Sequence, residues 1–123
     1  MTAAVTIEDV KAISTQPGGL PLTIVKVITS EDGLYGLGCA TFRGRYLAVH
    51  AAIEEHLKPF LRGRDVDQIT EIWQMSMVNG YWRNGPVLNN AISGVASSTC
   101  VVSWASRSSS CTISTSACSQ SRP

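Results

Sequence analysis

The fold of this chain is decided by the stretch Leu22-Thr-Ile-Val-Lys-Val-Ile-Thr-Ser-Glu-Asp-Gly-Leu-Tyr-Gly-Leu-Gly-Cys-Ala-Thr41. Its first eight residues are rich in β-branched side chains, which favours a strand over 22–29. Asp32-Gly33 is a residue pair suited to the positive φ of a hairpin turn. Residues 34–41 then alternate in size, as a second strand would. Its expected faces are Tyr35, Leu37 and Cys39 on one side, and Gly36, Gly38 and Ala40 on the other.

A further strand is predicted upstream, over residues 6–14. The segment Gln16-Pro-Gly-Gly-Leu-Pro21 ends it, because proline lacks the N–H that a strand ladder needs and glycine admits positive φ. With the hairpin that follows, the first half of the chain is predicted to form a three-stranded antiparallel meander.

The second half predicts helices. Residues 46–61 carry an apolar stripe at helical spacing, made of Ile53, Leu57, Phe60 and Leu61. Asp65, with Gln68 three residues on, resembles a capping box ahead of a second helix that Asn79-Gly80 would end. Pro86 suits the first turn of a third helix. Its stripe is Val87, Leu88, Ala91, Ile92 and Val95. Strands followed by helices, without alternation, indicate an α+β domain.

The composition changes abruptly after Val95. Residues 96–123 contain no acidic residue, Lys, Leu or Gly, and serine fills 11 of the 28 positions. Such a segment offers too few apolar residues to offset the entropy cost of ordering. We therefore expect one domain over residues 1–95 and a disordered, Ser-rich, non-native tail over residues 96–123.

Charge and hydropathy exclude several classes of protein. The net charge is +1 with no basic stripe, so neither nucleic acid nor an anionic membrane is an expected partner. No apolar run approaches the roughly 18 residues of a membrane span. The N-terminus resembles no signal peptide, and Cys39 is the only cysteine before residue 96. A cytoplasmic location is the expectation.

Several motifs have a structural explanation that is simpler than a functional one. Gly36-Leu-Gly38 follows a strand, but the third glycine of a dinucleotide motif is replaced by Thr41, so these glycines indicate a closely covered strand. His50 and His56 are six residues apart and not at the i, i+4 spacing of a zinc helix. The tail cysteines Cys100, Cys111 and Cys118 form no C-x-x-C pair, and Glu54-Glu55 is expected to be a solvated helix face. We predict no metal site and no catalytic residue in this chain.

The remaining candidates for ligand binding are Arg43 and Arg45, in the loop between the third strand and the first helix. Two guanidinium groups can hold a carboxylate through paired hydrogen bonds. Solvated surface arginines are the alternative explanation.

Several segments carry a resemblance to a known family. They are Asp32 to Arg45, Leu57-Lys-Pro-Phe-Leu-Arg-Gly-Arg-Asp65, Glu71-Ile-Trp-Gln74 and Tyr81-Trp-Arg-Asn-Gly-Pro86. Together they resemble the N-terminal capping domain of enolase-superfamily (mandelate racemase/muconate lactonizing enzyme-like) sugar-acid dehydratases. The nearest group is the mannonate and D-galactonate dehydratase subgroup, which includes starvation-sensing proteins.

The resemblance implies a function for the loops. In that family a second domain, a (β/α)8 barrel, holds Mg2+ and performs the dehydration, and the capping domain closes over the mouth of the barrel. The corresponding loops here are 16–21 and 41–45, which assigns substrate binding to Arg43 and Arg45. This chain has Arg43 where mannonate-active members have Asn, and Cys39 where they have a preceding Asp, which argues against mannonate as an efficient substrate.

The tail departs from the family. After Gly-Val the family continues Asp-Met-Ala-Leu-Trp-Asp-Ile-Lys-Gly, whereas this chain has Ala96-Ser-Ser-Thr-Cys100. Codons for Val-Asp-Met and for Leu-Tyr-Gln, read one base late, give Ser-Thr-Cys and Ser-Thr-Ser. These match Ser98-Thr-Cys100 and Ser114-Thr-Ser116. A frameshift is the preferred explanation, and an unrelated Ser-rich tail is the alternative.

The sequence thus predicts a truncated capping domain of a Mg2+-dependent sugar-acid dehydratase, without the barrel and inactive alone. The chain itself would bind no cofactor, and the sugar acid would be bound through the missing barrel. Self-association is expected if the third-helix stripe and Tyr81-Trp82 are left exposed. A stand-alone interaction module, or a regulatory partner of a full-length paralogue, is the alternative.

Overall fold

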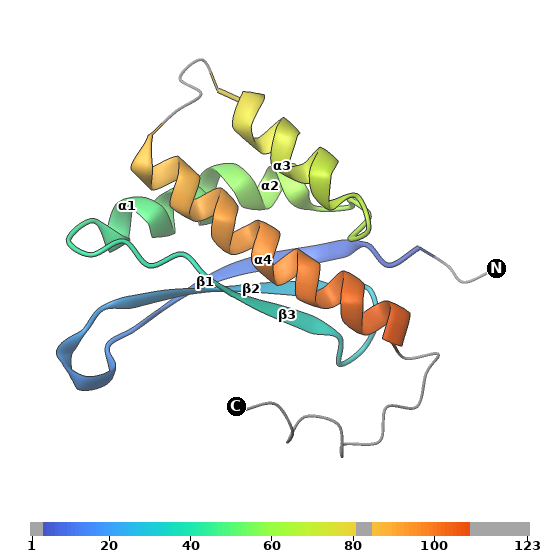
Figure 1. Cartoon of the computed structure of the whole chain (residues 1–123), viewed down its shortest axis with the longest axis horizontal. Coiled ribbons are helices and arrows are strands. Elements are labelled where there is room, and N and C mark those ends of the chain that lie inside the picture. The colour runs from blue at the N-terminus through green and yellow to red at the C-terminus, as the bar shows by residue number, and fades with distance from the viewer. Residues whose placement is uncertain (1–3, 81–84, 109–123) are drawn as a thin grey trace, which may run out of the picture.

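A single antiparallel sheet with helices on one of its faces makes up the protein in the computed structural model, which describes residues 4–80 and 85–108 (Figure 1). The strands are β1 (Ile7–Thr15), β2 (Leu22–Thr29) and β3 (Tyr35–Cys39), in the order β1-β2-β3. A short 3-10 turn, η1 (Pro17–Gly19), joins the first two strands. The predicted meander and the α+β class are confirmed.

The alternation within the strands separates the two faces of the sheet. Every second residue of β2, beginning with Thr23, is buried beneath the helices. On β3, Gly36 is buried, whereas the side chains of Tyr35 and Leu37 are each 50% exposed on the opposite face. The predicted division of β3 into a glycine face and a large-residue face is therefore confirmed.

The first predicted helix is present but is interrupted by a π-helical turn. It consists of α1 (Tyr46–Ala51), η2 (Ala52–Leu57) and α2 (Lys58–Leu61). Three residues of the predicted stripe are fully buried, and Phe60 is partly buried. Pro59 at the start of α2 has no N–H for the helix ladder, which is consistent with a change of hydrogen-bonding pattern just before it.

The second predicted helix begins later than its sequence signal suggested. It is α3 (Ile69–Val78), and its N-cap is Gln68, with no side-chain cap. Asp65 is not the N-cap. Its Oδ1 instead accepts a hydrogen bond from the N–H of Asp67 at 2.9 Å, closing a local turn before the helix. Ile72 is buried, but Trp73 is 47% exposed.

The third predicted helix begins at Pro86 as expected but does not end near Val95. It is α4 (Pro86–Ser108), and its buried residues include Ser98, Thr99, Val102 and Ser103. The expectation of a disordered tail is therefore wrong for residues 96–108. Residues 109–123 lie outside the described part, so the expectation there stays a prediction.

Close approach between α4 and β3 explains the glycines of the third strand. A Cβ on Gly36 would lie 2.0 Å from the carbonyl oxygen of Ser98, and one on Gly38 would lie 2.1 Å from that of Gly94. Gly94 in turn faces Ala40 and Val25, whose side-chain atoms would lie within 2.9 Å of an added Cβ. The helix backbone thus lies directly against the strand backbone, which only glycine permits.

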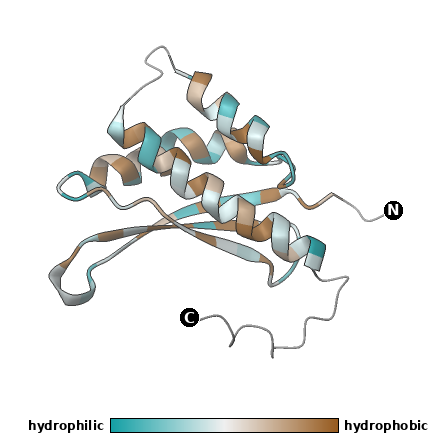
Figure 2. Ribbon diagram, in the orientation of Figure 1, coloured by the Kyte–Doolittle hydropathy of each residue, from teal (hydrophilic) through white to brown (hydrophobic). Residues whose placement is uncertain are grey.

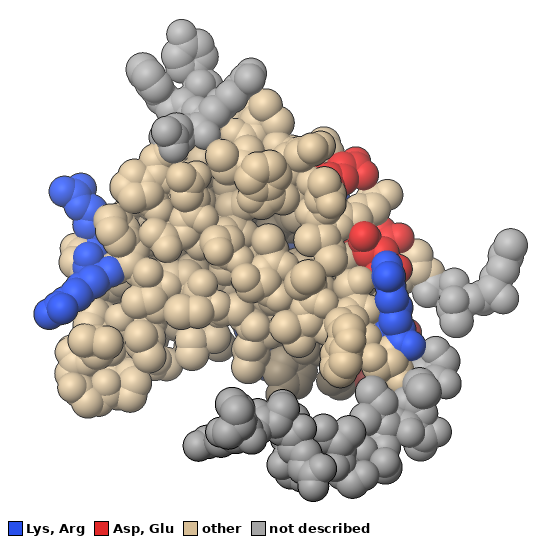
Figure 3. Space-filling view, viewed as in Figure 1, with Lys and Arg blue, Asp and Glu red and all other residues tan. Residues whose placement is uncertain are grey.

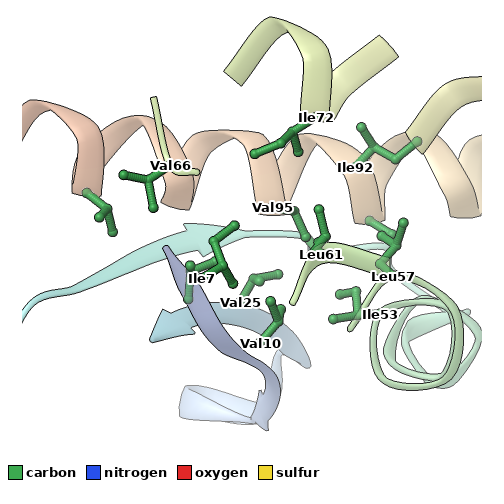
Figure 4. Packing of buried hydrophobic residues seen from close by; sticks show 14 of the residues in the cluster. Ile7, Val10, Val25, Ile53, Leu57, Leu61, Val66, Ile72, Ile92 and Val95 are labelled. Atoms are coloured by element: carbon green, nitrogen blue, oxygen red, sulfur yellow. The ribbon is translucent and has the colours of Figure 1, made fainter. Parts of the chain in front are cut away.

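The core lies between the sheet and the helices (Figure 4). It joins Ile7, Val10, Val25 and Val27 of the sheet to Ile53, Leu57, Leu61, Ile72, Ile92 and Val95 of the helices. Ala91, Ile92 and Val95 are at most 2% exposed. The apolar stripe of the third helix is thus buried in the domain's own core, which removes it as a cause of self-association. The other expected cause, Tyr81-Trp82, lies outside the described residues.

The outer edge of β1 is covered by the segment around α2. The N–H of Ile7 donates to the carbonyl of Arg64 at 2.8 Å, and the N–H of Gly63 donates to the carbonyl of Ile7 at 2.8 Å. The N–H of Ala12 donates to Oε1 of Glu54 at 2.7 Å, so Glu54 is not the freely solvated residue that the sequence indicated. These contacts satisfy backbone groups at an edge that another strand could otherwise pair with.

Ion pairs reinforce this cover. Oδ1 of Asp9 lies 3.2 Å from Nζ of Lys58 and 3.1 Å from a guanidinium nitrogen of Arg62. Burial opposes ionisation of Asp9, but the hydrogen bonds from these two cations outweigh it and hold the pKa of Asp9 below its ordinary value. Hydrogen bonds to Asp9 and Glu54 correspondingly raise the pKa of Lys58.

The last turns of α4 are tied to the segment before α3. Oγ of Ser103 donates to Oδ1 of Asp67 at 2.6 Å, and Arg107 lies 3.3 Å from the same oxygen. The hydrogen bond from Ser103, with the charge of Arg107, keeps the pKa of Asp67 below its ordinary value against partial burial. A folded-state pKa below the unfolded value stabilises the fold above the unfolded pKa, and this contribution is lost as pH falls through the folded pKa.

Ser103→Ala is therefore expected to lower the free energy of unfolding by about 1 kcal/mol at neutral pH. The difference from the native chain should shrink as the pH falls below about 4, because Asp67 becomes protonated. Urea unfolding at several pH values measures it, with Ser93→Ala, an exposed serine of the same helix, as the control. A loss that is equal for both variants, or independent of pH, would contradict the role of Asp67.

Candidate functional site

Two loops lie at the same end of the sheet. The β1–β2 connection, residues 16–21, and the loop from β3 to α1, residues 40–45, both emerge at the left of Figure 1. The β2–β3 turn and the end of α4 lie at the other end. The two loops that the sequence singled out are therefore brought to one end of the domain.

The loop between β3 and α1 is a compact turn. The N–H of Arg45 donates to the carbonyl of Phe42 at 3.2 Å, and Gly44 between them has φ 86°. Positive φ at the third position of a turn is the reason for glycine there. Arg45 is also the residue before α1, and its carbonyl accepts the N–H of Ala48 at 3.1 Å. Arg43 and Arg45 thus project from a backbone that the first turn of the helix holds in place.

Thr41 attaches this loop to the sheet. Its Oγ1 accepts the N–H of Thr23 at 3.3 Å and lies 3.0 Å from Sγ of Cys39. The N–H of Ala40 donates to the carbonyl of Thr23 at 2.9 Å. Thr23 is the second residue of β2, immediately after the 16–21 loop, so Thr41 connects the bases of both loops. The sequence did not single out this threonine, because nothing in its local pattern distinguishes it from a strand residue.

Both arginine side chains are accessible to a ligand. Arg43 and Arg45 are exposed, and within residues 4–80 and 85–108 neither guanidinium group forms a hydrogen bond or an ion pair. Figure 3 shows basic side chains gathered at the left edge of the molecule, beside this loop, with no acidic side chain near them on that face. A pair of unpaired guanidinium groups can bind an anionic or hydroxyl-rich ligand.

The 16–21 loop is held by its own hydrogen bonds. Nε2 of Gln16 donates to the carbonyl of Gly19 at 3.2 Å, and the N–H of Leu20 donates to the carbonyl of Pro17 at 3.3 Å. Gly18 and Gly19 have φ of 62° and 82°. Leu20 is 50% exposed and offers an apolar surface at the same end of the sheet as Arg43 and Arg45.

The described part of the chain does not supply a metal centre. Among residues 4–80 and 85–108, no group of three or more His, Cys, Asp or Glu side chains could hold a metal ion. No helix in the same residues has the length and apolar character needed to cross a membrane.

The family follows from comparison with known proteins. A family model described as the mandelate racemase / muconate lactonizing enzyme, N-terminal domain, matches residues 4–100. The chain belongs to this family. The match includes the first residues of the Ser-rich segment, as α4 does. The resemblance drawn from the sequence is thereby confirmed.

Curated relatives are much longer than this chain. D-galactonate dehydratase family member RspA from Pantoea ananatis is 60% identical over 89 residues, which are 72% of this chain and 21% of the relative. A D-galactonate dehydratase family member from Enterocloster bolteae is 59% identical over 91 residues, covering 74% of this chain and 22% of the relative. The chain thus spans about a fifth of the length of these relatives.

Solved structures share the fold. An enolase from Pantoea ananatis with bound D-gluconate and Mg is 51% identical and superposes with a TM-score of 0.82, over 84% of this chain and 25% of that chain. Muconate lactonizing enzyme from Pseudomonas putida is 27% identical with a TM-score of 0.69, over 80% and 28% respectively. In both cases the similarity covers the domain described above and less than a third of the larger protein.

Proposed function

We propose that this protein is the capping domain of a Mg2+-dependent sugar-acid dehydratase, with loops 16–21 and 41–45 facing the substrate. The observation that carries the proposal is the pair of unpaired guanidinium groups on a hydrogen-bonded turn beside a second loop. The relatives named as D-galactonate dehydratase family members, and the similar enolase with D-gluconate and Mg, support the substrate class.

The proposed role of the domain is positioning. Arg43 and Arg45 donate hydrogen bonds to the sugar acid, and the two loops exclude water from it. Bound Mg2+ would supply Lewis-acid stabilisation of negative charge that develops next to the carboxylate. The described residues contain no cluster that fits the metal, so no chemical step is assigned to them. A cytoplasmic location remains a prediction.

The 123-residue chain is expected not to dehydrate sugar acids by itself, because its described residues include no group that could hold the metal ion. The measurement is formation of the 2-keto-3-deoxy acid from a panel of hexonates, with and without Mg2+ and against a buffer blank. Mg2+-dependent product in proportion to protein concentration would show that the chain contains a complete active site.

The role of the arginines is testable in a chimaera. In it, residues 4–95 of this chain replace the matching part of the Pantoea ananatis enolase, whose own remaining sequence supplies the barrel. Arg43→Ala is expected to weaken D-gluconate binding by about tenfold, in line with the loss of a charge-assisted hydrogen bond. Arg45→Ala should weaken it by a similar factor if both contact the ligand.

The matched control is Lys11→Ala, which removes a positive charge from an exposed position on β1 without altering either loop. Isothermal titration with D-gluconate in the presence of Mg2+ compares the three variants. If the Arg43 and Lys11 variants bind D-gluconate equally well, the arginines are surface residues and their assignment to the site is wrong.

A further inference from the structure

The two edges of the sheet are treated differently. The edge at β1 is covered by the contacts of Ile7 and Ala12 described above. Within residues 4–80 and 85–108, the edge at β3 has no such cover. The N–H of Ala40 bonds to Thr23 of β2, and β3 continues this pairing through Gly38 and Gly36. In an antiparallel ladder the intervening residues direct their backbone groups away from the neighbouring strand.

The outward-facing groups therefore belong to Tyr35, Leu37 and Cys39. None of their N–H or C=O groups takes part in a hydrogen bond among the described residues outside the β2–β3 ladder. The strand, Tyr-Gly-Leu-Gly-Cys, also contains no lysine, proline, bulge or charge of the kind that protects natural sheet edges from pairing. As far as the described residues show, this edge is open to pairing with another strand.

The helix that covers β3, α4, is placed so that the α4 helix of a second molecule could pack beside it. Gly94 and Ser98 face β3, and Gly94 also faces Val25 of β2, so α4 lies over both strands and not beyond the edge. At 100° per residue, Ser97 and Val101 project from the side of α4 nearest the β3 edge. Ser97 is exposed and Val101 is 49% exposed.

We propose that this edge is a homodimer interface, in which β3 of one copy pairs antiparallel with β3 of a second copy about a two-fold axis through Leu37. The pairing joins Leu37 to its own copy, Gly36 to Gly38, and Tyr35 to Cys39. A closed two-fold contact requires a surface that complements itself. This strand meets that requirement because Gly36 and Gly38 flank Leu37 symmetrically.

The surroundings of the axis favour a second copy over an unrelated strand. Strand pairing at about 4.8 Å would place the two α4 helices side by side at the usual 8–10 Å of packed helices. They would meet at Ser97, whose small side chain permits close contact, with Val101 beside it. Neither β3 nor this side of α4 near Ser97 and Val101 carries a charge, so no like charges oppose each other across the axis.

The proposal differs from the earlier expectation of self-association in the surface that it uses. That expectation relied on the stripe of the third helix, which is buried in the core. The present surface uses the exposed side of the same helix and an open strand edge. It does not depend on the proposed function, and neither Arg43 nor Arg45 takes part in it.

Sedimentation velocity over a concentration series of the full 123-residue chain is the first test. The native chain should show a monomer–dimer equilibrium. Ser97→Arg should raise the dimer dissociation constant by at least about tenfold, because it fills the space between the helices. Gln74→Arg adds the same charge at an exposed position on α3, away from the β3 edge, and should leave the constant unchanged within about twofold.

Leu37→Pro tests the strand separately, since it removes an outward N–H without touching the β2–β3 hydrogen bonds. It should raise the dissociation constant as Ser97→Arg does, while Leu37→Ala, which keeps the N–H, should raise it less. A native chain that is monomeric at every concentration overturns the proposal. Equal effects of Ser97→Arg and Gln74→Arg overturn it as well.

A cross-link fixes the register independently of these variants. In the proposed pairing Tyr35 lies opposite Cys39 of the second copy at about 5.5 Å between Cα atoms, which is within disulfide range. Tyr35→Cys, in a chain whose Cys100, Cys111 and Cys118 are replaced by serine, should form a covalent dimer on mild oxidation. The same chain with Cys39→Ser should not, and a covalent dimer that forms equally well without Cys39 contradicts the register.

Discussion

Gly36→Ala is expected to destabilise the domain by about 3 kcal/mol, a large part of the 5–15 kcal/mol that stabilises a typical domain. The new Cβ would lie 2.0 Å from the carbonyl oxygen of Ser98, and 2.7 Å from Cγ2 of Val102. The first of these atoms is backbone, so relief requires α4 as a whole to move away from β3. The reduced entropy of the unfolded chain offsets only about 0.4–1 kcal/mol of this cost.

The midpoint of urea unfolding measures the effect, provided that the slope of the transition stays constant. Lys11→Ala, at an exposed position of β1, is the control, because the loss of that side chain leaves no buried cavity and does not touch β3. A Gly36 variant as stable as the native chain would show that α4 does not lie against β3.

Ending the chain after Val95 is expected to abolish cooperative unfolding. It removes the part of α4 that covers Gly36, together with Val102, which is fully buried and whose burial contributes about 1.5–3 kcal/mol. It also removes the hydrogen bond from Ser103 to Asp67. Together these two losses come to about 2.5–4 kcal/mol, a large part of the 5–15 kcal/mol that stabilises a typical domain, and the sheet around Gly36 loses its cover as well.

Thermal unfolding followed by circular dichroism compares chains ending after Val95 and after Ser108. The longer chain should unfold cooperatively at nearly the temperature of the full-length protein, because it contains every described element. If the shorter chain unfolds sharply and at the same temperature as the longer one, the folded domain ends at residue 95, as the sequence indicated.

The strands and their faces could be predicted because period-two alternation in β2 and β3 is unambiguous. The end of α4 could not, because the composition of residues 96–108 is typical of a disordered tail. In the helix, however, small residues are what the contact with β3 requires. The hydroxyls of Ser98 and Thr99 donate to helix carbonyls at 2.9 and 2.8 Å, so these polar side chains are buried without unsatisfied hydrogen bonds.

Within the candidate site, the prolines and glycines of residues 16–21 indicated the first loop, and the second loop was indicated by its place between the third predicted strand and the first predicted helix. The bridge through Thr41 depends on the approach of β2 and β3 in space, which local sequence does not show. Asp65 was wrongly predicted as an N-cap. A carboxylate at this position can cap a helix, but here it accepts a hydrogen bond from the N–H of Asp67 and closes a turn before the helix begins.

The origin of residues 96–123 by a frameshift stays a prediction. Because residues 96–108 are helical, expected disorder no longer supports a frameshift there. The match between shifted codons and the Ser-Thr segments still supports it. Sequencing the DNA that follows the codon for Val95 tests it. A reading frame for a dehydratase barrel, shifted by one base, is the expected result.

The most direct measurement of the central claim is D-gluconate binding by the chimaera that joins residues 4–95 of this chain to the barrel of the Pantoea ananatis enolase. If these residues are the capping domain of a sugar-acid dehydratase, the chimaera should bind D-gluconate in the presence of Mg2+ within about tenfold of the affinity of the enolase itself. A chimaera that unfolds cooperatively and binds Mg2+, yet shows no affinity for D-gluconate or any other hexonate, would contradict the proposed function.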